Sequence, residues 1–393
     1  MFRKNRFNRV VERMREQKLP LRIRLLWDGT VLDLADAPQV TITIPAIASL
    51  RHFFSPTLDT LGHAYVEGEI DVEGRVTDVI EVAARLAAGG SRPQTGLYRV
   101  PRRVRHNRKM DAAAIAYHYD VSNEFYSHWL DPGMVYSCAY FRSEGDSLAV
   151  AQEQKIDHIL RKLRVRPGDR LLDIGCGWGA LVMRAAERFG ARALGITLSH
   201  SQYELAQERI AAAGLTDRCE VRIEDYRDVT GRFDRIASVG MFEHVGCKNL
   251  RGYFGRVREL LADDGIALNH GITATNADGG GGDFIKRYVF PHSELPPIGL
   301  TLQEMVAAKL EPVDVENLRR HYALTLGQWA ERFEAAGPRL RELAGEKRWR
   351  IWRVYLAGCA YGFAHNWISV HQVLAVKEGT ASLPLTRDYI YND

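Results

Sequence analysis

The chain has 393 residues, of which 46% are hydrophobic and 26% are charged, and its formal net charge is +4. This hydrophobic content can fill the core of two ordinary domains or one large domain, which excludes a globally disordered chain. The five cysteines are scattered and form no Cys-x-x-Cys pair, a pattern that argues against disulfides and zinc knuckles and favours a cytoplasmic location. No apolar run approaches the roughly 18 residues of a membrane span, so we expect any work on lipid to take place at a membrane surface.

Basic residues are concentrated at the N-terminus, where residues 1–24 contain nine of them and two acidic residues. Four apolar side chains in this segment recur at helical spacing: Phe7, Val10, Val11 and Met14. A basic amphipathic helix of this kind can lie on an anionic membrane leaflet. The alternative is a helix whose apolar side packs on its own domain and whose basic side stays in water.

The remainder of residues 1–90 predicts a small α+β domain. Residues 61–74 alternate in polarity as in a short meander, and residues 78–90 predict a helix followed by glycines. Residues 91–110 are rich in Pro, Gly and Arg and predict a basic linker. Within it, residues 101–109 contain five basic residues and no acidic one, which indicates a surface that faces anions.

From residue 111 onward, strand and helix patterns alternate. The predicted strands are 170–175, 192–197, 220–225, 233–240 and 265–273, and the predicted helices are the one that ends at 189, 199–214 and 249–262. Such alternation predicts a parallel, doubly wound sheet. Ligands of these sheets bind at the carboxyl ends of the strands.

The loop after the first of these strands indicates a cofactor. Asp173 precedes Gly175, Gly177 and Gly179 with the spacing G-x-G-x-G, which differs from the G-x-G-x-x-G of dinucleotide-binding proteins. An acid beside this loop repels a pyrophosphate and suits a cation such as the amino group of a methionine. Cys176 between the glycines is interpreted as a packing residue. The segment resembles the class I S-adenosylmethionine-dependent methyltransferases, whose fold is a Rossmann-like α/β sandwich with a mainly parallel seven-stranded sheet.

The rest of the expected cofactor site follows from that resemblance. The second strand ends in "ITLSHSQ", without the acid that usually binds the ribose hydroxyls, so Thr197 and Gln202 are expected to bind the ribose. The segment "EDYRD" (224–228) is expected to flank the adenine through Asp225 and Tyr226, with Asp225 near the exocyclic amine. Tyr136 and Ser137 are expected at the methionine end.

Seven motifs in unbroken order narrow the family. They are "HYDVSNEFY" (118–126), "LDPGMVYSCAYF" (130–141), "LDIGCGWG", "TLSHSQ", "DYRD", "GMFEHVG" and "YVFPHSELP" (288–296). Together they resemble the cyclopropane-fatty-acyl-phospholipid synthases and their mycolic-acid-modifying relatives, from about Tyr117 to the C-terminus. Residues 1–90 resemble the small extra domain of the bacterial phospholipid enzymes. The expected organisation is therefore a lipid-associated domain (1–90), a basic linker (91–110) and a catalytic domain (111–393).

The resemblance also implies a reaction. Members of this family transfer a methylene group from S-adenosylmethionine to a cis double bond of phospholipid acyl chains, through a carbocation that a bound bicarbonate or carbonate ion deprotonates. The positions that match the ligands of this ion are Cys138, Glu243, His270, the backbone at Ile272, and Tyr322. The implied substrate is unsaturated phospholipid at the inner, anionic face of a membrane, with no nucleic acid and no metal, and the resemblance allows a homodimer.

This chemistry requires exclusion of water and a tolerated cation, since water quenches a carbocation and aromatic faces stabilise it. Five aromatic residues are candidates for this role, with core packing as the alternative: Tyr140, Phe141, Tyr288, Phe290 and Tyr322. His118 and Tyr119 are expected either at the entry to the cofactor site or in a structural loop. His244 and Cys247 lack the further partners that a zinc site needs.

Alternative functions remain open. The same cation can lose a proton from the chain instead of from the new methyl group, which gives a methyl or methylene branch in place of a ring, and no motif separates the two outcomes. A basic surface beside a methyl donor also fits a nucleic-acid methyltransferase, but the Asn/Asp-Pro-Pro-Tyr/Phe motif of amino-methylating enzymes is absent after the fourth strand. A cofactor-binding protein without catalysis is disfavoured because every matched ligand position is filled.

Overall fold

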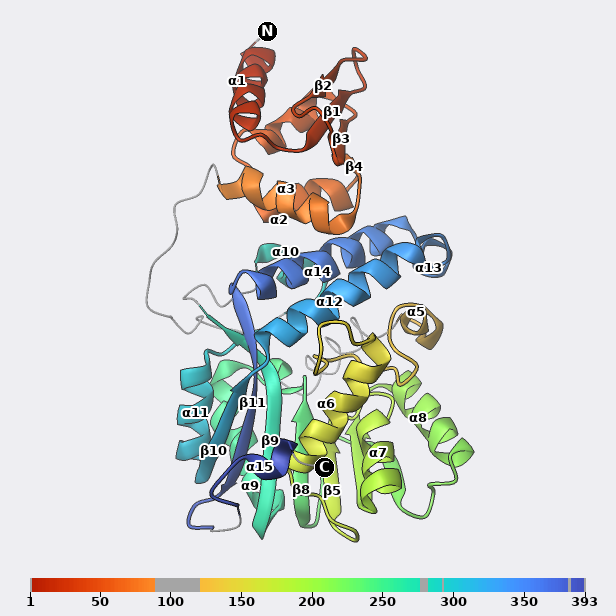
Figure 1. The fold of residues 1–393 in the computed structure, drawn as a ribbon, viewed down its shortest axis with the longest axis vertical. Coiled ribbons are helices and arrows are strands. Elements are labelled where there is room, and N and C mark those ends of the chain that lie inside the picture. The colour runs from red at the N-terminus through yellow and green to blue at the C-terminus, as the bar shows by residue number, and fades with distance from the viewer. Residues whose placement is uncertain (1, 89–120, 276–281, 292, 381–382, 392–393) are drawn as a thin grey trace. The chain divides into compact units, whose positions relative to one another are not determined.

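A computed structural model describes residues 2–88, 121–275, 282–291, 293–380 and 383–391, with side chains from Phe7 onward (Figure 1). The predicted linker at 91–110, His118 and Tyr119 lie outside the described residues. The chain folds into two compact units. The first contains the N-terminal residues together with Gly282–Val289 and Leu326–Gly362, and the second contains the rest. The domain boundaries inferred from the sequence stay a prediction.

The first unit contains a four-stranded sheet with the order β2-β1-β3-β4. Its strands are β1 (Leu21–Leu25), β2 (Val31–Asp33), β3 (Val40–Ile44) and β4 (Asp71–Glu73). β1 and β3 are parallel, and the other pairs are antiparallel. The N-terminal elements around it are α1 (Phe2–Glu16), η1 (Ile47–Phe53), α2 (Leu58–Val66) and α3 (Val76–Ala88).

The predicted meander at 61–74 is wrong in its first half. Residues 61–66 belong to α2, whose start is stabilised by a capping box in which Thr57 and Thr60 bond each other's backbone amides. Leu61, Ala64 and Tyr65 are buried on one helical face. The apolar residues here recur with a spacing of three to four, as in a helix. The polar residues between them produced an alternation that was wrongly interpreted as a strand.

The apolar side of α1 is buried within the first unit. Phe7, Val10, Val11 and Met14 are all buried, and the ring of Phe7 meets Phe53 edge to face with centroids 6.3 Å apart. The exposed side of the helix includes Arg9, Arg13 and Arg15. Of the two expectations for this helix, the structure therefore has the second one, in which the apolar side packs on its own domain and the basic side stays in water.

Helices from the C-terminal part of the chain complete the first unit. They are α10 (Asp283–Tyr288), the later turns of α12 (Arg319–Ala335), α13 (Gly337–Ala344) and most of α14 (Glu346–Ala364). Arg353 of α14 is buried and donates to Glu334 at 2.5 Å and to the backbone carbonyl of Gly74 at 2.8 Å. Its charge is thus paired, as a buried guanidinium requires.

The second unit is built on a seven-stranded sheet with the order β10-β11-β9-β8-β5-β6-β7. Its strands are β5 (Arg170–Ile174), β6 (Arg192–Thr197), β7 (Cys219–Ile223), β8 (Phe233–Val239), β9 (Leu261–Ala274), β10 (Leu310–Asn317) and β11 (Ile368–Lys377). β7, β6, β5, β8 and β9 are mutually parallel, whereas β11 and β10 are antiparallel to their neighbours. The mainly parallel α/β fold predicted from the sequence is confirmed.

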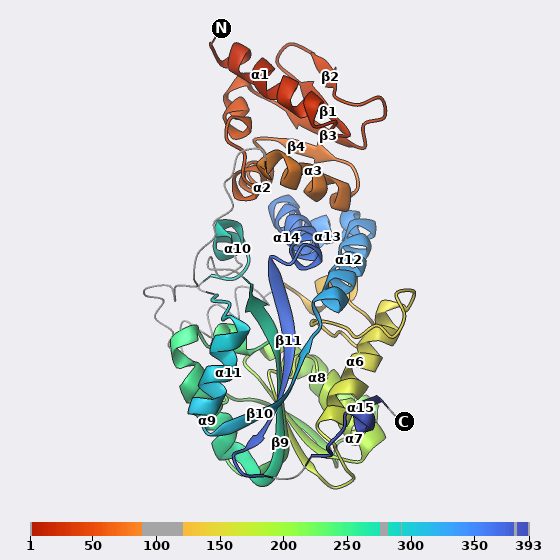
Figure 2. The ribbon, with the colours of Figure 1, turned by 60° about the vertical axis from the view of Figure 1, so that its left-hand side comes forward.

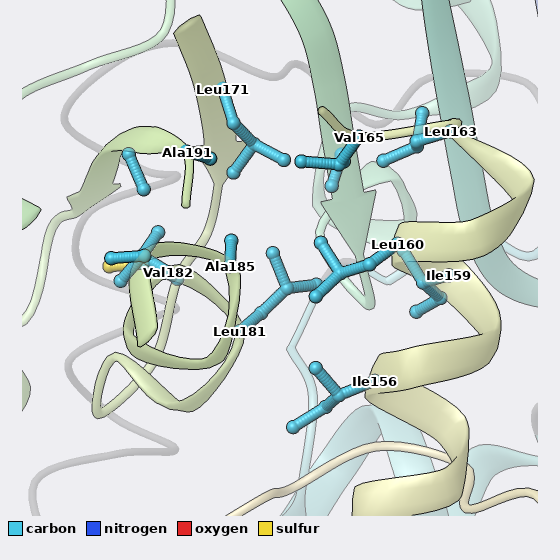
Figure 3. Packing of buried hydrophobic residues seen from close by; sticks show 14 of the residues in the cluster. Ile156, Ile159, Leu160, Leu163, Val165, Leu171, Leu181, Val182, Ala185 and Ala191 are labelled. Atoms are coloured by element: carbon cyan, nitrogen blue, oxygen red, sulfur yellow. The ribbon is translucent and has the colours of Figure 1, made fainter. Parts of the chain in front are cut away.

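Helices cover both faces of this sheet (Figures 1 and 2). One face carries α6 (Leu148–Lys162), α7 (Ala180–Phe189) and α8 (His200–Ala212); the other carries α9 (Leu250–Leu260) and α11 (Ile298–Ala307). Figure 3 shows side chains of α6 and α7 meeting Leu171 of β5. The remaining short elements are α5 (Asn123–Ser127), η2 (Phe242–His244), η3 (Cys247–Asn249) and α15 (Asp388–Tyr391). Among the described residues, no helix combines the length and apolarity needed to cross a membrane.

Candidate active site

A cavity lies at the carboxyl ends of β5, β6 and β8, where the topology of a doubly wound sheet predicts a ligand site. Eight of the nine residues predicted to bind the cofactor line it: Tyr136, Ser137, Asp173, Gly175, Gly177, Thr197, Gln202 and Tyr226. Further lining residues without a role predicted from the sequence include Lys155, Trp178 and His244, and Glu224, from the segment expected to flank the adenine, also lines the cavity. The elements that carry these residues are far apart in the sequence, so only the folded sheet brings them together.

The glycine loop between β5 and α7 supplies backbone to one wall of the cavity. Gly175 and Gly177 have φ angles of +86° and +55°, in the region that favours glycine. A Cβ atom on Gly175 would also lie 3.1 Å from Met241. Cys176 between them is buried and packs against Gly195, where a Cβ atom would come within 2.7 Å of it, as expected of a packing residue.

Asp173 and Lys155 form the charged part of the cavity. Asp173 is 2% exposed, burial raises its pKa to about 7, and Oδ1 has no hydrogen-bond partner among the described residues. Lys155 of α6 is also buried, burial lowers its pKa to about 8, and its Nζ donates to Ser137 Oγ at 2.8 Å. A buried carboxylate oxygen without a partner, facing a cavity, fits a cationic group such as the ammonium of S-adenosylmethionine.

The far part of the cavity holds the polar residues expected at the ribose and adenine. Thr197 Oγ1 donates to Gln202 Oε1 at 2.8 Å, so the two residues predicted to bind the ribose form one unit. Asp225 is not among the residues that line the cavity; its carboxylate accepts from the guanidinium of Arg227 at 2.7 and 2.8 Å. Its neighbour Glu224 does line the cavity. The adenine role of Asp225 stays a prediction.

Aromatic side chains pack around Tyr136, at the end of the cavity that is expected to hold the methionine. Tyr126 of α5 lies with its ring centroid 5.7 Å from that of Tyr136 and 5.2 Å from that of Trp178. Trp178 donates its indole N–H to Asn123 Oδ1 at 2.7 Å. The motif "SNEFY" therefore positions two lining residues, Tyr136 and Trp178, through packing and one hydrogen bond.

The second constellation surrounds Glu243, just beyond the end of β8. Glu243 Oε1 accepts a hydrogen bond from the backbone N–H of Ile272 in β9 at 2.7 Å. Its other oxygen, Oε2, is buried without a hydrogen-bond partner in the described part of the chain. Burial raises the pKa of this carboxyl group to about 7. Two of the predicted ion ligands, Glu243 and the backbone at Ile272, are thus in direct contact.

Close packing fixes the position of Glu243. The ring of its neighbour Phe242 lies against Gly271, where a Cβ atom would come within 1.9 Å of the ring. Gly271 separates His270 from Ile272 in β9, so the same contact sets the position of both. Only glycine leaves room for this approach.

His270 of β9 is 1% exposed. Burial is the largest cause that lowers the pKa of its imidazole well below the usual value, and the nearby cation Lys155 adds to it. The ring is therefore neutral near pH 7. Its Nε2 atom has no hydrogen-bond partner among the residues that the structure describes.

Cys138 and Tyr322 both contact the backbone of Leu318. The thiol of Cys138 lies 3.8 Å from the carbonyl oxygen of Leu318, and the amide of Tyr322 donates to that same oxygen at 3.0 Å. Leu318 in turn donates to Val370, whose strand position is opposite Ile272. Burial raises the pKa of the Cys138 thiol, so the sulfur keeps its proton and acts as a hydrogen-bond donor.

The five aromatic candidates differ in their surroundings. Tyr140 is stacked between His158 and His321, with centroid distances of 4.2 and 4.7 Å, and Phe141 is buried. The Phe290 ring lies 5.8 Å from that of His244, and the Tyr322 ring lies 4.6 Å from that of Phe363. Tyr288 belongs to the first unit, where its hydroxyl donates to Glu67 at 2.8 Å.

The predicted ion ligands have the chemistry that a small oxygen anion requires. Glu243 Oε2 and His270 Nε2 are buried polar atoms without partners among the described residues, and such atoms are costly unless a ligand or water satisfies them. A neutral imidazole N–H and a neutral thiol can donate to an anion, and a carboxyl group with a raised pKa can share a proton with it. The atoms of Glu243 and His270 therefore fit a bicarbonate ion, whereas the N–H of Ile272 already donates to Glu243 and the Cys138 thiol lies against the carbonyl oxygens of Ala139 and Leu318.

Comparison with known proteins defines the family. A family model described as mycolic acid cyclopropane synthetase matches residues 106–373, and a second model, described as a domain of unknown function, matches residues 8–92. A probable fatty acid methyltransferase of Pseudomonas putida is 48% identical over 383 residues, which cover 95% of this chain and 96% of that protein. The cyclopropane-fatty-acyl-phospholipid synthase of Escherichia coli K12 is 40% identical over 261 residues, 65% of this chain and 66% of that protein.

A solved structure agrees with these relatives. The mycolic acid cyclopropane synthase CmaA1, complexed with SAH and CTAB, matches with a TM-score of 0.65 and 34% identity, over 68% of this chain and 98% of that one. The glycine loop, the acid at the end of β5 and the sheet order all agree with a cofactor site of this class. The chain belongs to the mycolic acid cyclopropane synthetase family of S-adenosylmethionine-dependent methyltransferases and has their class I fold.

Proposed function

We propose that the protein is a cyclopropane-fatty-acyl-phospholipid synthase, which adds a methylene group to the cis double bond of unsaturated phospholipid acyl chains. The observation that carries the proposal is the buried set of Glu243, Ile272 and His270, in which one carboxylate oxygen and one imidazole nitrogen have no partner among the described residues. When bound, S-adenosylmethionine supplies the electrophilic carbon, and a bicarbonate ion supplies the base that completes ring closure.

The residues proposed to hold that ion are Cys138, Glu243, His270, the backbone at Ile272, and Tyr322. Their side chains are buried, and burial keeps the thiol protonated and the imidazole neutral. Neutral donors orient an anion without cancelling its charge, so the ion keeps its basicity. Glu243 has a pKa of about 7 and can accept a proton from the ion or return it within the physiological range.

Exclusion of water is the second contribution of these residues. A cation formed on an acyl chain reacts with any water within reach. Cys138 is fully buried, and His270, Glu243 and Tyr322 are each less than 10% exposed. This burial supports a reaction in which the base reaches the cation before solvent does.

The test is incubation of the protein with vesicles of unsaturated phospholipid and isotope-labelled S-adenosylmethionine, in buffer freed of carbon dioxide and then supplemented with bicarbonate. We expect a gain of one methylene mass in the fatty acids, cyclopropane signals in the NMR spectrum, and turnover that rises with bicarbonate. Vesicles of fully saturated phospholipid are the matched control and should give no product. Label in the head group, or none in the lipid, would contradict the proposal.

Methyl or methylene branching of the acyl chain is the second candidate. It is favoured by the Pseudomonas putida relative, named as a probable fatty acid methyltransferase, which aligns with 95% of the chain, whereas the phospholipid synthase aligns with 65%. The same labelled product decides between the two. High-field ring protons indicate a cyclopropane. A methyl doublet, or the alkene proton signals of a =CH2 group on the chain, indicates a branch.

The substrate location is a further part of the proposal. The exposed basic side of α1, which includes Arg9 and Arg13, supports electrostatic attachment to the anionic face of a membrane. Insertion of the helix is disfavoured because its apolar side is already packed. Co-sedimentation with anionic vesicles should weaken with salt and with Arg9→Gln/Arg13→Gln, and competition by RNA as strong as that by vesicles would contradict a lipid surface.

A further inference from the structure

The structure places a glutamine directly opposite His270. Strands β11 and β9 are antiparallel, and their register pairs Gln372 with His270. Side chains at directly opposed positions of antiparallel strands project from the same face of the sheet. Gln372 is fully buried, and its Nε2 lies 3.1 Å from His270 Nδ1.

The hydrogen bond decides which ring nitrogen of His270 carries the proton. A neutral imidazole has one N–H and one lone pair, and the tautomer follows from the partner of the other nitrogen. Because the amide of Gln372 faces the ring with its Nε2, it can only donate, so Nδ1 accepts and the proton lies on Nε2; the other end of the amide, Oε1, has no partner among the described residues. That is the atom without a partner among the described residues, and it becomes a hydrogen-bond donor in need of an acceptor.

We infer that Gln372 is a positioning residue, which holds His270 in the Nε2–H tautomer and so aims a neutral donor at the bound anion. The inference rests on the proposed function, because it assumes that His270 contacts the ion. Gln372 itself acts through His270.

The charged and titratable groups around His270 are compatible with this arrangement. Lys155 and Lys162 of α6 and the neighbouring His158 disfavour a second proton on the ring, whereas Glu316 of β10 favours one. Glu316 is itself engaged by His158 at 2.7 Å and by Lys162 at 2.6 Å. The charge of Glu316 is therefore compensated by these two partners. The imidazole of His270 stays neutral, with one fixed tautomer.

Two substitutions of Gln372 separate the effect of the His270 tautomer from the effect of side-chain packing. Gln372→Met keeps the length of the side chain and removes the donor. Gln372→Glu presents a carboxylate, which can only accept from Nδ1–H when ionised, and so reverses the tautomer or stabilises the doubly protonated ring. Gln207→Met is the matched control, because the amide of Gln207 donates to the carbonyl of Val221 at 2.9 Å, on the β7 side of the sheet.

The primary readout is the ¹⁵N NMR spectrum of histidine-labelled protein, with the His270 signals identified by their loss in His270→Gln. We expect a protonated Nε2 in the native protein and in Gln207→Met, a mixture of tautomers in Gln372→Met, and a protonated Nδ1 in Gln372→Glu. The half-saturating bicarbonate concentration should rise about twofold in Gln372→Met, because in an equal mixture only half of the rings carry the proton on Nε2. It should rise about tenfold in Gln372→Glu, which loses one hydrogen bond to a charged group, while the KM for S-adenosylmethionine stays unchanged in both.

The outcomes distinguish this inference from the proposed function. A native protein with a protonated Nδ1, or a Gln372→Met protein with unchanged tautomer and unchanged bicarbonate dependence, overturns the inference. A changed tautomer with unchanged turnover and bicarbonate dependence instead overturns the proposed role of His270. If Gln372→Glu does not fold, as judged by its thermal midpoint and circular dichroism, the uncharged Gln372→Met variant decides the question alone.

Discussion

Two buried carboxyl groups at adjacent strands serve the site in different ways. Asp173 in β5 and Glu243 beyond β8 both have pKa values of about 7, and burial is the main cause in each case. Asp173 lines an open cavity beside the cation Lys155. Glu243 is not part of that lining; it is held by the backbone of Ile272 in tightly packed surroundings. The same shift means that Asp173 must lose a proton before it can bind a cation, whereas under the proposed function it lets Glu243 exchange a proton with an anion.

The largest effect is expected where packing holds Glu243 in place. Gly271→Ala puts a Cβ atom 1.9 Å from the Phe242 ring, which forces Phe242 and Glu243 to shift. We expect a loss of about 1–3 kcal/mol of stability and a fall in turnover well beyond tenfold. Thermal unfolding and vesicle assays measure both. The control Gly252→Ala, in α9, has no atom within 4 Å of the new Cβ, and equal behaviour of the two variants would show that the packing is not critical.

Glu243→Gln tests the acid in the packed surroundings. The amide keeps the shape of the side chain, and its carbonyl still accepts from Ile272, but it cannot exchange a proton with the anion. Turnover should fall more than tenfold, at least about 1.4 kcal/mol in activation free energy, with unchanged binding of S-adenosylmethionine. The control is Glu304→Gln, which breaks a surface pair with Arg251. A folded Glu243→Gln protein with native turnover would refute the proposed role.

Asp173→Asn tests the acid in the open cavity. Without its charge the cavity loses attraction for the ammonium group, and we expect affinity for S-adenosylhomocysteine, measured by calorimetry, to fall about tenfold. The same change removes a buried charge, so the thermal midpoint should rise by about 2–5 °C. Turnover at saturating cofactor should change much less than in Glu243→Gln. Unaltered affinity would contradict the cationic partner.

The pH dependence should separate the two acids. The pKa of Asp173 is raised to about 7, so below pH 7 the group must lose a proton before it can bind a cation. The KM for S-adenosylmethionine should therefore rise by up to tenfold per pH unit below 7 and level off above it. By linkage, an acid with a raised pKa costs stability as the pH rises from about 4 to about 7. Lys155, with a pKa of about 8, loses its charge above that range. A flat KM profile, or the same profile in Asp173→Asn, would exclude this assignment.

The smallest effect is expected at Asp225. Its carboxylate is already bound by Arg227, so Asp225→Asn should change cofactor affinity by less than about threefold. Glu224→Gln, at a residue that lines the cavity, should have the larger effect. Titration with S-adenosylhomocysteine compares the two variants. The opposite order would favour the adenine contact expected of Asp225 from the sequence.

Local patterns predicted five of the seven strands of the second unit's sheet and the helices α7, α8 and α9. The strand 192–197 agrees with β6 in both bounds, and the helix predicted over 199–214 is α8, which Ser199 caps through the amide of Gln202. These predictions succeed because strand alternation, helix caps and glycine turns depend on neighbouring residues. The N-terminal region was harder, since a short helix with scattered polar residues imitates a strand, as at 61–66.

The sequence by itself determined the class of fold and the glycine loop with its acid, since each depends on a short motif, and its resemblance to a known family named the residues expected at the two sites. Tertiary structure alone decided that Lys155 faces Asp173, that Asp225 turns to Arg227, and that Gln372 meets His270 across two strands 102 positions apart. The physical reason is that the protonation and orientation of a buried polar group depend on its hydrogen-bond partners. When these partners are distant in the chain, strand register and packing decide which of them meet, and no local sequence pattern contains that information.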